Sequence, residues 1–146
     1  MSRDRSTKTV AALQTASLDN LVRVSFQVMS EMTRLAAEEN MSLTSLRLLA
    51  ILQDRQPRMA DLAAALGIDR SSVSGLIARA EQRGLVVRTA AEVDGRGVVV
   101  GLTDAGRSFT ESLSRRTFVR LAPLVAALDA DEHELLASVL KKVGRA

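Results

Sequence analysis

Apolar residues recur every three or four positions along the first third of the chain, which predicts two amphipathic helices separated near Asn40. Charged residues lie mostly between the apolar ones, so we expect the first helix to be amphipathic. The extent of the pattern predicts one long helix. A shorter helix follows, with Ser42 or Thr44 able to cap its start and Pro57 beyond its end. The stripe of the first helix comprises Leu18, Leu21, Val22, Val28, Met29, Met32, Leu35 and Ala36.

The last third of the chain has the same helical pattern. Thr103 is placed as the N-cap of a long helix that Pro123 is expected to kink, and a final helix is expected from about Asp129. These apolar helices either pack on the central part or pair with a second copy. We expect a homodimer with 10–40 and 104–146 as dimerisation helices, because little chain remains to cover both ends. The contact residues expected are Leu18, Leu21, Leu121, Leu124, Leu128, Leu136 and Leu140.

Residues 59–83 predict two short helices that meet at a tight turn. Gly67 can adopt a positive φ at that turn. Small Ala63 lets the helices approach, and Ile68 and Val73 fill the angle between them. These features meet the requirements of a helix-turn-helix, although any short helical hairpin uses the same residue types.

Two β-prone runs follow at 85–89 and 98–102, with a turn-rich segment at 90–96 between them. A helix-turn-helix followed by a hairpin is a winged helix, whose second helix enters the major groove and whose hairpin tip can reach a minor groove. The sequence therefore predicts a mainly α fold with a small β-hairpin wing. We expect one domain over 1–146, with the winged helix-turn-helix at 41–103.

The second helix of the motif, at about 70–83, has a small and polar outer face. Hydroxyl groups can bond phosphates or base edges, and small side chains permit close approach to the groove. Asp69 and the neighbouring serines could instead serve only to cap the helix. Gly75 favours the groove-facing interpretation, because an interior glycine costs a helix about 1 kcal/mol relative to alanine. The positions opposite the apolar side are Ser71, Gly75, Ala78 and Gln82.

Asp94, Gly95 and Arg96 stand at the expected tip of the hairpin. An arginine there is placed to enter the narrow, electronegative minor groove, and Asp94 can orient it or its loop. A single arginine in a loop can equally be a solvated surface charge, and spacing alone leaves the two readings open.

Four segments together form a specific combination of sequence motifs. They are LTSLRLLAIL at 43–52, DLAAALGIDRSSVSGLIARAEQRGLVVR at 61–88, VDGR at 93–96 and LTDAG at 102–106. Together they resemble the multiple antibiotic resistance regulator (MarR) family of bacterial winged-helix transcription factors, and the element order does so over about 18–145. The resemblance implies a dimer that binds pseudo-palindromic double-stranded DNA, often as a repressor. Many members of that family are released from DNA by small, commonly phenolic ligands.

By position, the resemblance places DNA contacts on one helix and on the wing. Gly95 occupies the position where the family often has the first of two wing arginines. Arg47 occupies a position where the family often has glutamine. Arg58 replaces a threonine that commonly caps the first helix of the motif, so it could serve a phosphate instead. The contacts carried over by position are Arg70, Ser71, Ser72, Ser74, Gly75, Asp94 and Arg96. The further cations expected on the same face are Arg58, Arg79, Arg83 and Arg88.

The effector pocket of the resembled family lies between the dimerisation helices and the winged module. Methionine and phenylalanine at helical spacing are also ordinary core residues, so both interpretations stay open. A small-molecule effector is a further expected partner of unspecified identity. The candidate lining residues are Phe26, Met29, Met32, Met41 and Leu48.

The amino-acid composition excludes several classes of protein function. A net charge of +3 is mild, and three Phe without Tyr or Trp offer little for stacking single-stranded bases. The chain has no Cys, His133 is its only histidine, and it has no phosphate-binding glycine motif. We therefore expect no enzyme, no metal and no cofactor. No apolar run reaches the roughly 20 residues that span a bilayer, so we expect a cytoplasmic protein without a membrane partner.

The function expected from these features is that of a dimeric, sequence-specific regulator of transcription. Two alternatives stay open: a winged-helix protein that binds DNA without sequence preference, and a module that binds another protein.

Overall fold

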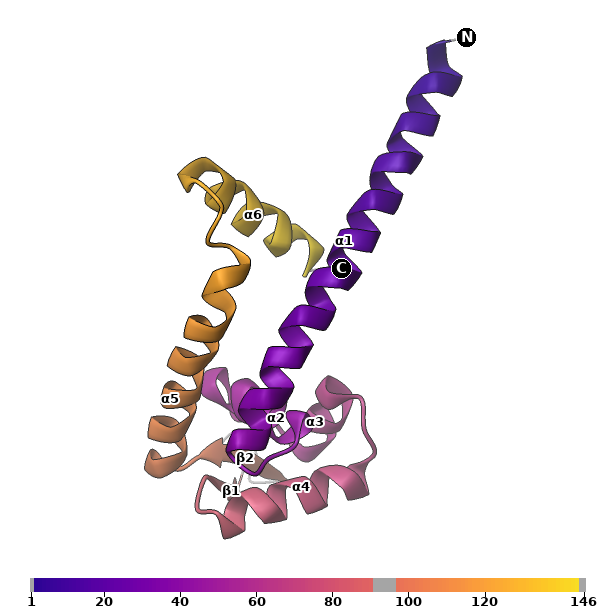
Figure 1. Ribbon diagram of the computed structural model, residues 1–146. Coiled ribbons are helices and arrows are strands. Elements are labelled where there is room, and N and C mark those ends of the chain that lie inside the picture. Colours follow the sequence, from indigo (N-terminus) through magenta and orange to yellow (C-terminus); the bar gives the residue numbers. More distant parts are fainter. Residues whose placement is uncertain (1, 91–96, 145–146) are drawn as a thin grey trace.

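The computed structural model describes residues 2–90 and 97–144, and it confirms a mainly α fold with a two-stranded antiparallel hairpin (Figure 1). A short 3-10 turn, η1, lies between the last two helices. In chain order the elements are α1 Ser2–Glu38, α2 Leu43–Asp54, α3 Met59–Leu66, α4 Arg70–Gln82, β1 Val86–Ala90, β2 Val98–Leu102, α5 Asp104–Leu121, η1 Ala122–Leu124 and α6 Ala130–Val143.

The helix starts expected from the sequence are confirmed. Ser42 accepts a hydrogen bond from the backbone N–H of Ser45 at the start of α2, and Thr103 caps α5 in the same way. Asp129 caps α6 through the backbone N–H of Glu132. These side chains satisfy donors that a helix start leaves without an intrahelical partner.

The prediction that Pro123 kinks a continuous helix is wrong, because the helix ends before Pro123. Instead of bending one continuous helix, the chain leaves α5 at Leu121 and passes through η1, which contains Pro123. Proline has no N–H to donate and its ring clashes with the preceding turn, so the α-helical ladder stops there.

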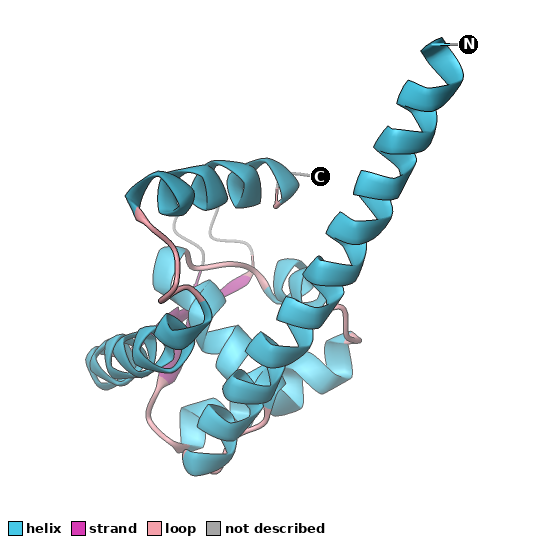
Figure 2. Ribbon diagram, turned by 45° about the horizontal axis from the view of Figure 1, so that its top comes forward, coloured by secondary structure: helices cyan, strands magenta, loops and turns pink. Residues whose placement is uncertain are grey.

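The helix α1 is longer than the expected 10–40 at its leading end, because it begins at Ser2. Every residue from 11 to 27 is exposed. In both overall views this leading half projects beyond the rest of the chain, and α6 lies apart from the winged module (Figure 2). None of the described residues of α6 is buried.

The core lies where the end of α1 meets α2, the helix-turn-helix and the hairpin. Gly67 ends α3 with φ 68°, which confirms the turn expected from the sequence. Val73 is fully buried in the angle between α3 and α4, and Ile68 packs against the same core. The largest fully buried side chains are Leu35, Leu48, Leu49, Leu62, Ile77, Val73 and Val100.

The hairpin is anchored to the segment before α3. Its register pairs Val86 with Leu102 at the base and Ala90 with Val98 toward the tip. The N–H of Val100 donates to the carbonyl of Pro57 at 3.0 Å. An isolated bridge between Arg58 and Val99 extends this pairing. The wing is therefore hydrogen-bonded to the body along β2.

Candidate nucleic-acid interface

The start of α4 is built around the carboxylate of Asp69. One oxygen accepts the N–H of Ser72 at 2.9 Å and the hydroxyl of Ser71 at 2.5 Å, and the other accepts the hydroxyl of Ser72 at 2.7 Å. The hydroxyl of Ser71, then the hydroxyl and N–H of Ser72, hold the pKa of Asp69 well below its ordinary value. The capping interpretation is thus confirmed for Asp69. Both serines remain exposed, and their oxygens can still accept a hydrogen bond.

The outer face of α4 presents small and polar residues to solvent, as expected. Ser71, Ser74 and Gln82 are exposed, while Gly75 and Ala78 are half-buried. A Cβ at position 75 would meet only the Nη1 atom of Arg79, at an ordinary 3.6 Å. Packing therefore does not require glycine there. The buried side of the helix consists of Val73, Leu76, Ile77 and Ala80.

Arg88 joins the first strand of the wing to α4. Its Nη2 donates to the backbone carbonyl of Ser74 at 3.4 Å, and its Nη1 lies 3.4 Å from the carboxylate of Glu81. Part of its hydrogen-bonding capacity is therefore used within the chain, which fixes the hairpin beside the outer face.

Arg58 lies beside β2, on the side toward the tip of the wing. It occupies the N-cap position of α3 without a side-chain cap hydrogen bond, as the sequence indicated, and its backbone N–H donates to Asp61 at 3.3 Å. A Cβ at Gly97 would lie 3.9 Å from Nη1 of Arg58, so the guanidinium group runs alongside the hairpin. Asp94 and Arg96, expected at the tip, lie outside the described residues.

Arg79 and Arg83 lie on another flank of α4. Together with the turn between α1 and α2 they line a cavity of about 190 Å³. The guanidinium carbon of Arg83 also lies 5.7 Å from the ring centroid of Phe109 in α5, a cation–π distance. Arg70 is exposed at the start of α4. Arg70, Arg79 and Arg83 therefore lie at different points along α4 and its end, while Arg58 and Arg88 lie on neighbouring segments.

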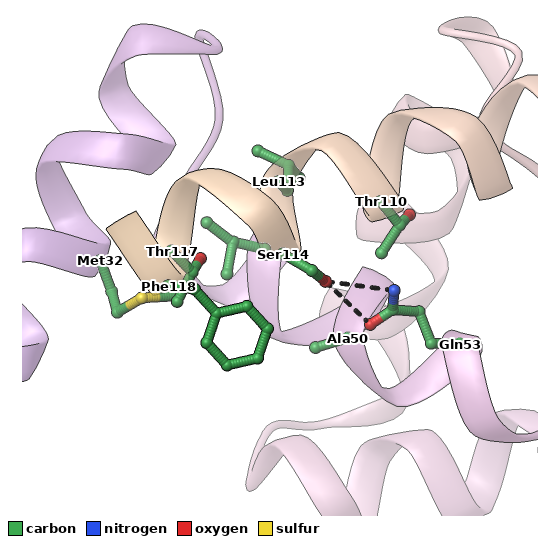
Figure 3. Close-up of a pocket in the computed structure, with 9 residues that line it drawn as sticks. Met32, Ala50, Gln53, Thr110, Leu113, Ser114, Thr117 and Phe118 are labelled. Atoms are coloured by element: carbon green, nitrogen blue, oxygen red, sulfur yellow. Dashed lines mark hydrogen bonds between the residues drawn. The ribbon is translucent and has the colours of Figure 1, made fainter. Parts of the chain in front are cut away.

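The candidate effector residues do not share one cavity. Phe26 and Met29 are exposed on α1, Leu48 is fully buried in the core, and Met41 lines the cavity beside Arg79. Met32 alone among them lines a cavity of about 160 Å³ between α1, α2 and α5 (Figure 3).

That second cavity is mostly apolar with a polar edge. Gln53 of α2 donates to the hydroxyl of Ser114 of α5 at 3.2 Å, as the dashed lines in Figure 3 mark. The contribution of α5 could not be predicted from the sequence, because helical periodicity does not indicate which faces of distant helices meet. The lining residues are Met32, Leu46, Ala50, Gln53, Thr110, Leu113, Ser114, Thr117 and Phe118.

The expected dimerisation residues are exposed or half-buried in the single chain. Leu18, Leu21, Leu124 and Leu140 are exposed, as are other large apolar side chains of α1, α5 and α6. Leu121, Leu128 and Leu136 are half-buried. The other exposed apolar residues of these helices include Val22, Phe26, Phe118, Val119, Leu135, Val139 and Val143.

An ion-pair network between α1 and α5 was not foreseen. Arg120 approaches the carboxylate of Glu38 at 2.5 Å and that of Glu31 at 3.6 Å, and Arg116 bonds both Glu38 and Glu39. Hydrogen bonds from Arg120 and then Arg116 lower the pKa of Glu38. The only signal in the sequence is the spacing of the acids and of the arginines along each helix.

Within residues 2–90 and 97–144, no helix is long and apolar enough to cross a membrane. The same described ranges contain no group of three or more His, Asp or Glu residues that could hold a metal ion.

The fold and the exposed face of α4 beside a hairpin define a winged helix-turn-helix protein. Residues 39–97 match the family model described as MarR family. The resemblance to the MarR family noted in the sequence is therefore confirmed by the match over residues 39–97.

Relatives and solved structures agree with this assignment. The chain is 29% identical over 130 residues to the HTH-type transcriptional regulator YkoM of Bacillus subtilis (strain 168), covering 86% of this chain and 84% of YkoM. A MarR family transcriptional regulator from Silicibacter pomeroyi DSS superimposes with a TM-score of 0.73 at 26% identity, covering 84% of this chain and 83% of that one. NadR in complex with 4-hydroxyphenylacetate gives 0.69 at 25% identity, with 85% and 89% covered.

Proposed function

We propose that this chain is a dimeric regulator of transcription that binds duplex DNA in a sequence-specific manner, with α4 in the major groove. The observation that carries the proposal is the outer face of α4, which is small, polar and exposed beside a hairpin. Such a face permits close approach to base edges, and phosphate contacts from surrounding arginines position it. A MepR variant from S. aureus with the same fold was solved bound to an oligodeoxyribonucleotide, at 23% identity and a TM-score of 0.61.

The proposed groups fall into two sets. The first set lies on α4 and the arginines around it: Ser71, Ser72, Ser74 and Gly75 face the groove, while the cations Arg58, Arg70 and Arg88 contact the backbone. The second set, Asp94 and Arg96, lies on the wing, with Arg96 in the minor groove. Repression is the expected outcome of binding, because a regulator bound over a promoter excludes other proteins from it.

Site-directed variants test this assignment. The probe is a duplex that the wild-type protein selects from a random pool. Ser74→Ala and Arg96→Ala are each expected to weaken its binding by about 1–3 kcal/mol, as for a base-reading or groove-inserted side chain. Arg55→Ala, at an exposed arginine between α2 and α3, is the matched control and should leave the affinity unchanged. Unchanged affinity in both test variants would favour a module that binds another protein.

Dimerisation is supported by the apolar surface of the terminal helices. Leu18 and Leu21 of α1 and Leu140 of α6 are exposed in the single chain. A monomer rarely exposes contiguous apolar patches of this kind, and homodimers are the commonest way to cover them. In the proposed dimer, α1, α5 and α6 of the two copies cover one another.

A small-molecule effector is proposed for the cavity lined by Met32, Gln53, Ser114 and Phe118. Its apolar wall and single amide–hydroxyl pair suit a small aromatic ligand with a hydrogen-bonding group. Phenol and 4-hydroxyphenylacetate are suitable probes. A ligand in this cavity raises the thermal midpoint of the wild-type protein, but not that of Ala50→Trp, which fills the cavity. Equal shifts in both proteins would place binding elsewhere.

A further inference from the structure

A second polar surface adjoins α4, away from the effector cavity. It is the cavity of about 190 Å³ between the α1–α2 turn and one flank of α4, here called the flank cavity. Its lining contains two arginines and no acidic residue, so its charge is wholly positive. The lining residues are Asn40, Met41, Ser42, Ser45, Leu76, Arg79, Ala80 and Arg83.

The two arginines of the flank cavity differ from others in the described part of the chain. Arg88, Arg116 and Arg120 each pair with glutamate, whereas no described ion pair includes Arg79 or Arg83. The ring of Phe109 lies under the guanidinium group of Arg83 and restricts it without neutralising its charge. The flank cavity therefore holds two positive charges that no nearby carboxylate balances.

The flank cavity is continuous with the outer face of α4. Nη1 of Arg79 lies 3.6 Å from the place where a Cβ of Gly75 would stand, so its guanidinium group extends along the groove-facing surface. On the hairpin side of the helix, Arg88 bonds the carbonyl of Ser74. A helix lying in the major groove, which is about 12 Å wide, has a phosphate backbone on each side.

We propose that the flank cavity binds a backbone phosphate of duplex DNA, on the edge of the major groove away from the wing. Arg79 and Arg83 supply the charge, and Asn40 and Ser45 line the same cavity as neutral hydrogen-bonding groups. This inference rests on the proposed function, since α4 must occupy the groove for the phosphate to arrive. It divides the phosphate contacts between two flanks of α4, so each protomer is held from both sides of the groove.

The first test measures the salt dependence of binding to the selected duplex. Arg79→Ala/Arg83→Ala is expected to lower the slope of log K against log salt by about 0.9 per lost phosphate contact, or about 2 for a dimer. The ranking of duplexes with single base changes should stay the same, because a phosphate contact carries no direct sequence information. Arg79→Lys/Arg83→Lys should keep most of the slope, and Arg55→Ala should keep all of it.

A second variant separates the phosphate contact from folding. Ser45 is the third residue of α2 after the Ser42 cap, so Ser45→Glu completes a Ser-x-x-Glu capping box. The variant should therefore melt no lower than the wild-type protein. Its carboxylate would add a negative charge to the lining of the flank cavity, and we expect binding to weaken by about tenfold or more through like-charge repulsion with the phosphate. Ser45→Gln is the uncharged control and should bind nearly as the wild-type protein does.

The outcomes distinguish the inference from the function on which it rests. An unchanged salt slope in the double alanine variant, or unchanged affinity in Ser45→Glu, overturns the phosphate assignment while duplex binding stands. If the wild-type protein selects no duplex at all, the proposed function fails together with this inference. Weakened binding accompanied by an altered base preference also overturns it, because the arginines would then read bases.

Discussion

A Cβ at position 106 would lie 1.9 Å from the carbonyl oxygen of Leu85, so glycine is the residue that lets α5 start against the chain that leaves α4. The same carbonyl accepts the N–H of Thr103 at 3.1 Å, and the Thr103 hydroxyl donates to the carbonyl of Gly84 at 2.6 Å. The first turn of α5 and the end of the helix-turn-helix are thus one tightly packed joint. A shift of α5 at this joint must move Leu85 or break these bonds.

Gly106→Ala is expected to destabilise the fold strongly. The neighbouring atom is a backbone carbonyl, which cannot move without displacing the strand, so we expect a loss of about 3 kcal/mol in the free energy of unfolding. Urea unfolding followed by circular dichroism measures it. A change below about 0.5 kcal/mol would show that the joint relaxes easily, contrary to this description.

Gly75→Ala should have the opposite effect on stability. The added Cβ meets only the Nη1 atom of Arg79, and alanine favours the helix by about 0.5–1 kcal/mol. We expect a raised free energy of unfolding together with weaker binding to the selected duplex, because the methyl group lies on the groove-facing surface. Equal or tighter duplex binding would remove this position from the interface.

The cap of α4 predicts a dependence of stability on pH. Because the folded-state pKa of Asp69 is lowered, its stabilising effect is complete above the ordinary value of 3.8. That effect is lost as the pH falls from there toward the lowered folded value. Asp69→Ala should therefore lower the thermal midpoint at pH 7, and the difference from wild type should shrink below about pH 4.

The hydroxyl donors can be tested directly at the same cap. Carboxyl NMR titration of Asp69 should give a pKa below its ordinary value in the wild-type protein. Ser72→Ala removes one donor, so the pKa of Asp69 should move back toward that value. An ordinary pKa in the wild-type protein would mean that the serine hydroxyls do not hold the carboxylate.

The ion pairs between α1 and α5 are expected to make a salt-sensitive contribution to the stability of the fold. Glu38→Gln should lower the thermal midpoint by about 2–4 °C at low salt, since Glu38 bonds both Arg116 and Arg120. At 1 M salt the Debye length is about 3 Å, so the difference should nearly vanish. A difference that persists at high salt would assign the effect to packing instead of charge.

Much of the fold could be predicted from local sequence signals. Ser42 and Thr103 cap helices as expected, the last helix starts at Asp129 as expected, and Gly67 has the positive φ that the helix-turn-helix requires. Each of these depends on residues a few positions apart, where residue type strongly restricts conformation. The winged helix was predictable because several such signals follow one another in a fixed order.

The surroundings of the candidate site were less predictable, because they depend on contacts between distant segments. The sequence suggested Arg88 as a cation of the DNA-binding face but could not indicate that it also pairs with Glu81. Leu48 shares its residue type with pocket-lining residues, yet the packing of α2 buries it completely. The pairing of Gln53 with Ser114 joins positions 61 residues apart. Helical periodicity identifies an apolar face but not the neighbour that covers it.

Dimerisation is directly measurable by light scattering. The wild-type chain should have twice the 15.7 kDa of one protomer at micromolar concentration. Leu140→Asp places a charge on the exposed apolar surface of α6 and should shift the population toward the monomer. Glu134→Asp on the same helix is the conservative control. A wild-type monomer at these concentrations would contradict the proposed assembly.

The central claim is sequence-specific recognition of duplex DNA, and the ratio of two affinities tests it most directly. The wild-type protein is titrated at one moderate salt concentration with its selected duplex and with a scrambled duplex of equal length and composition. We predict that the selected duplex binds at least about 10³-fold tighter and contains two half-sites about 34 Å apart. Comparable affinity for both duplexes would contradict the claim and indicate a protein that binds DNA through its backbone charge alone.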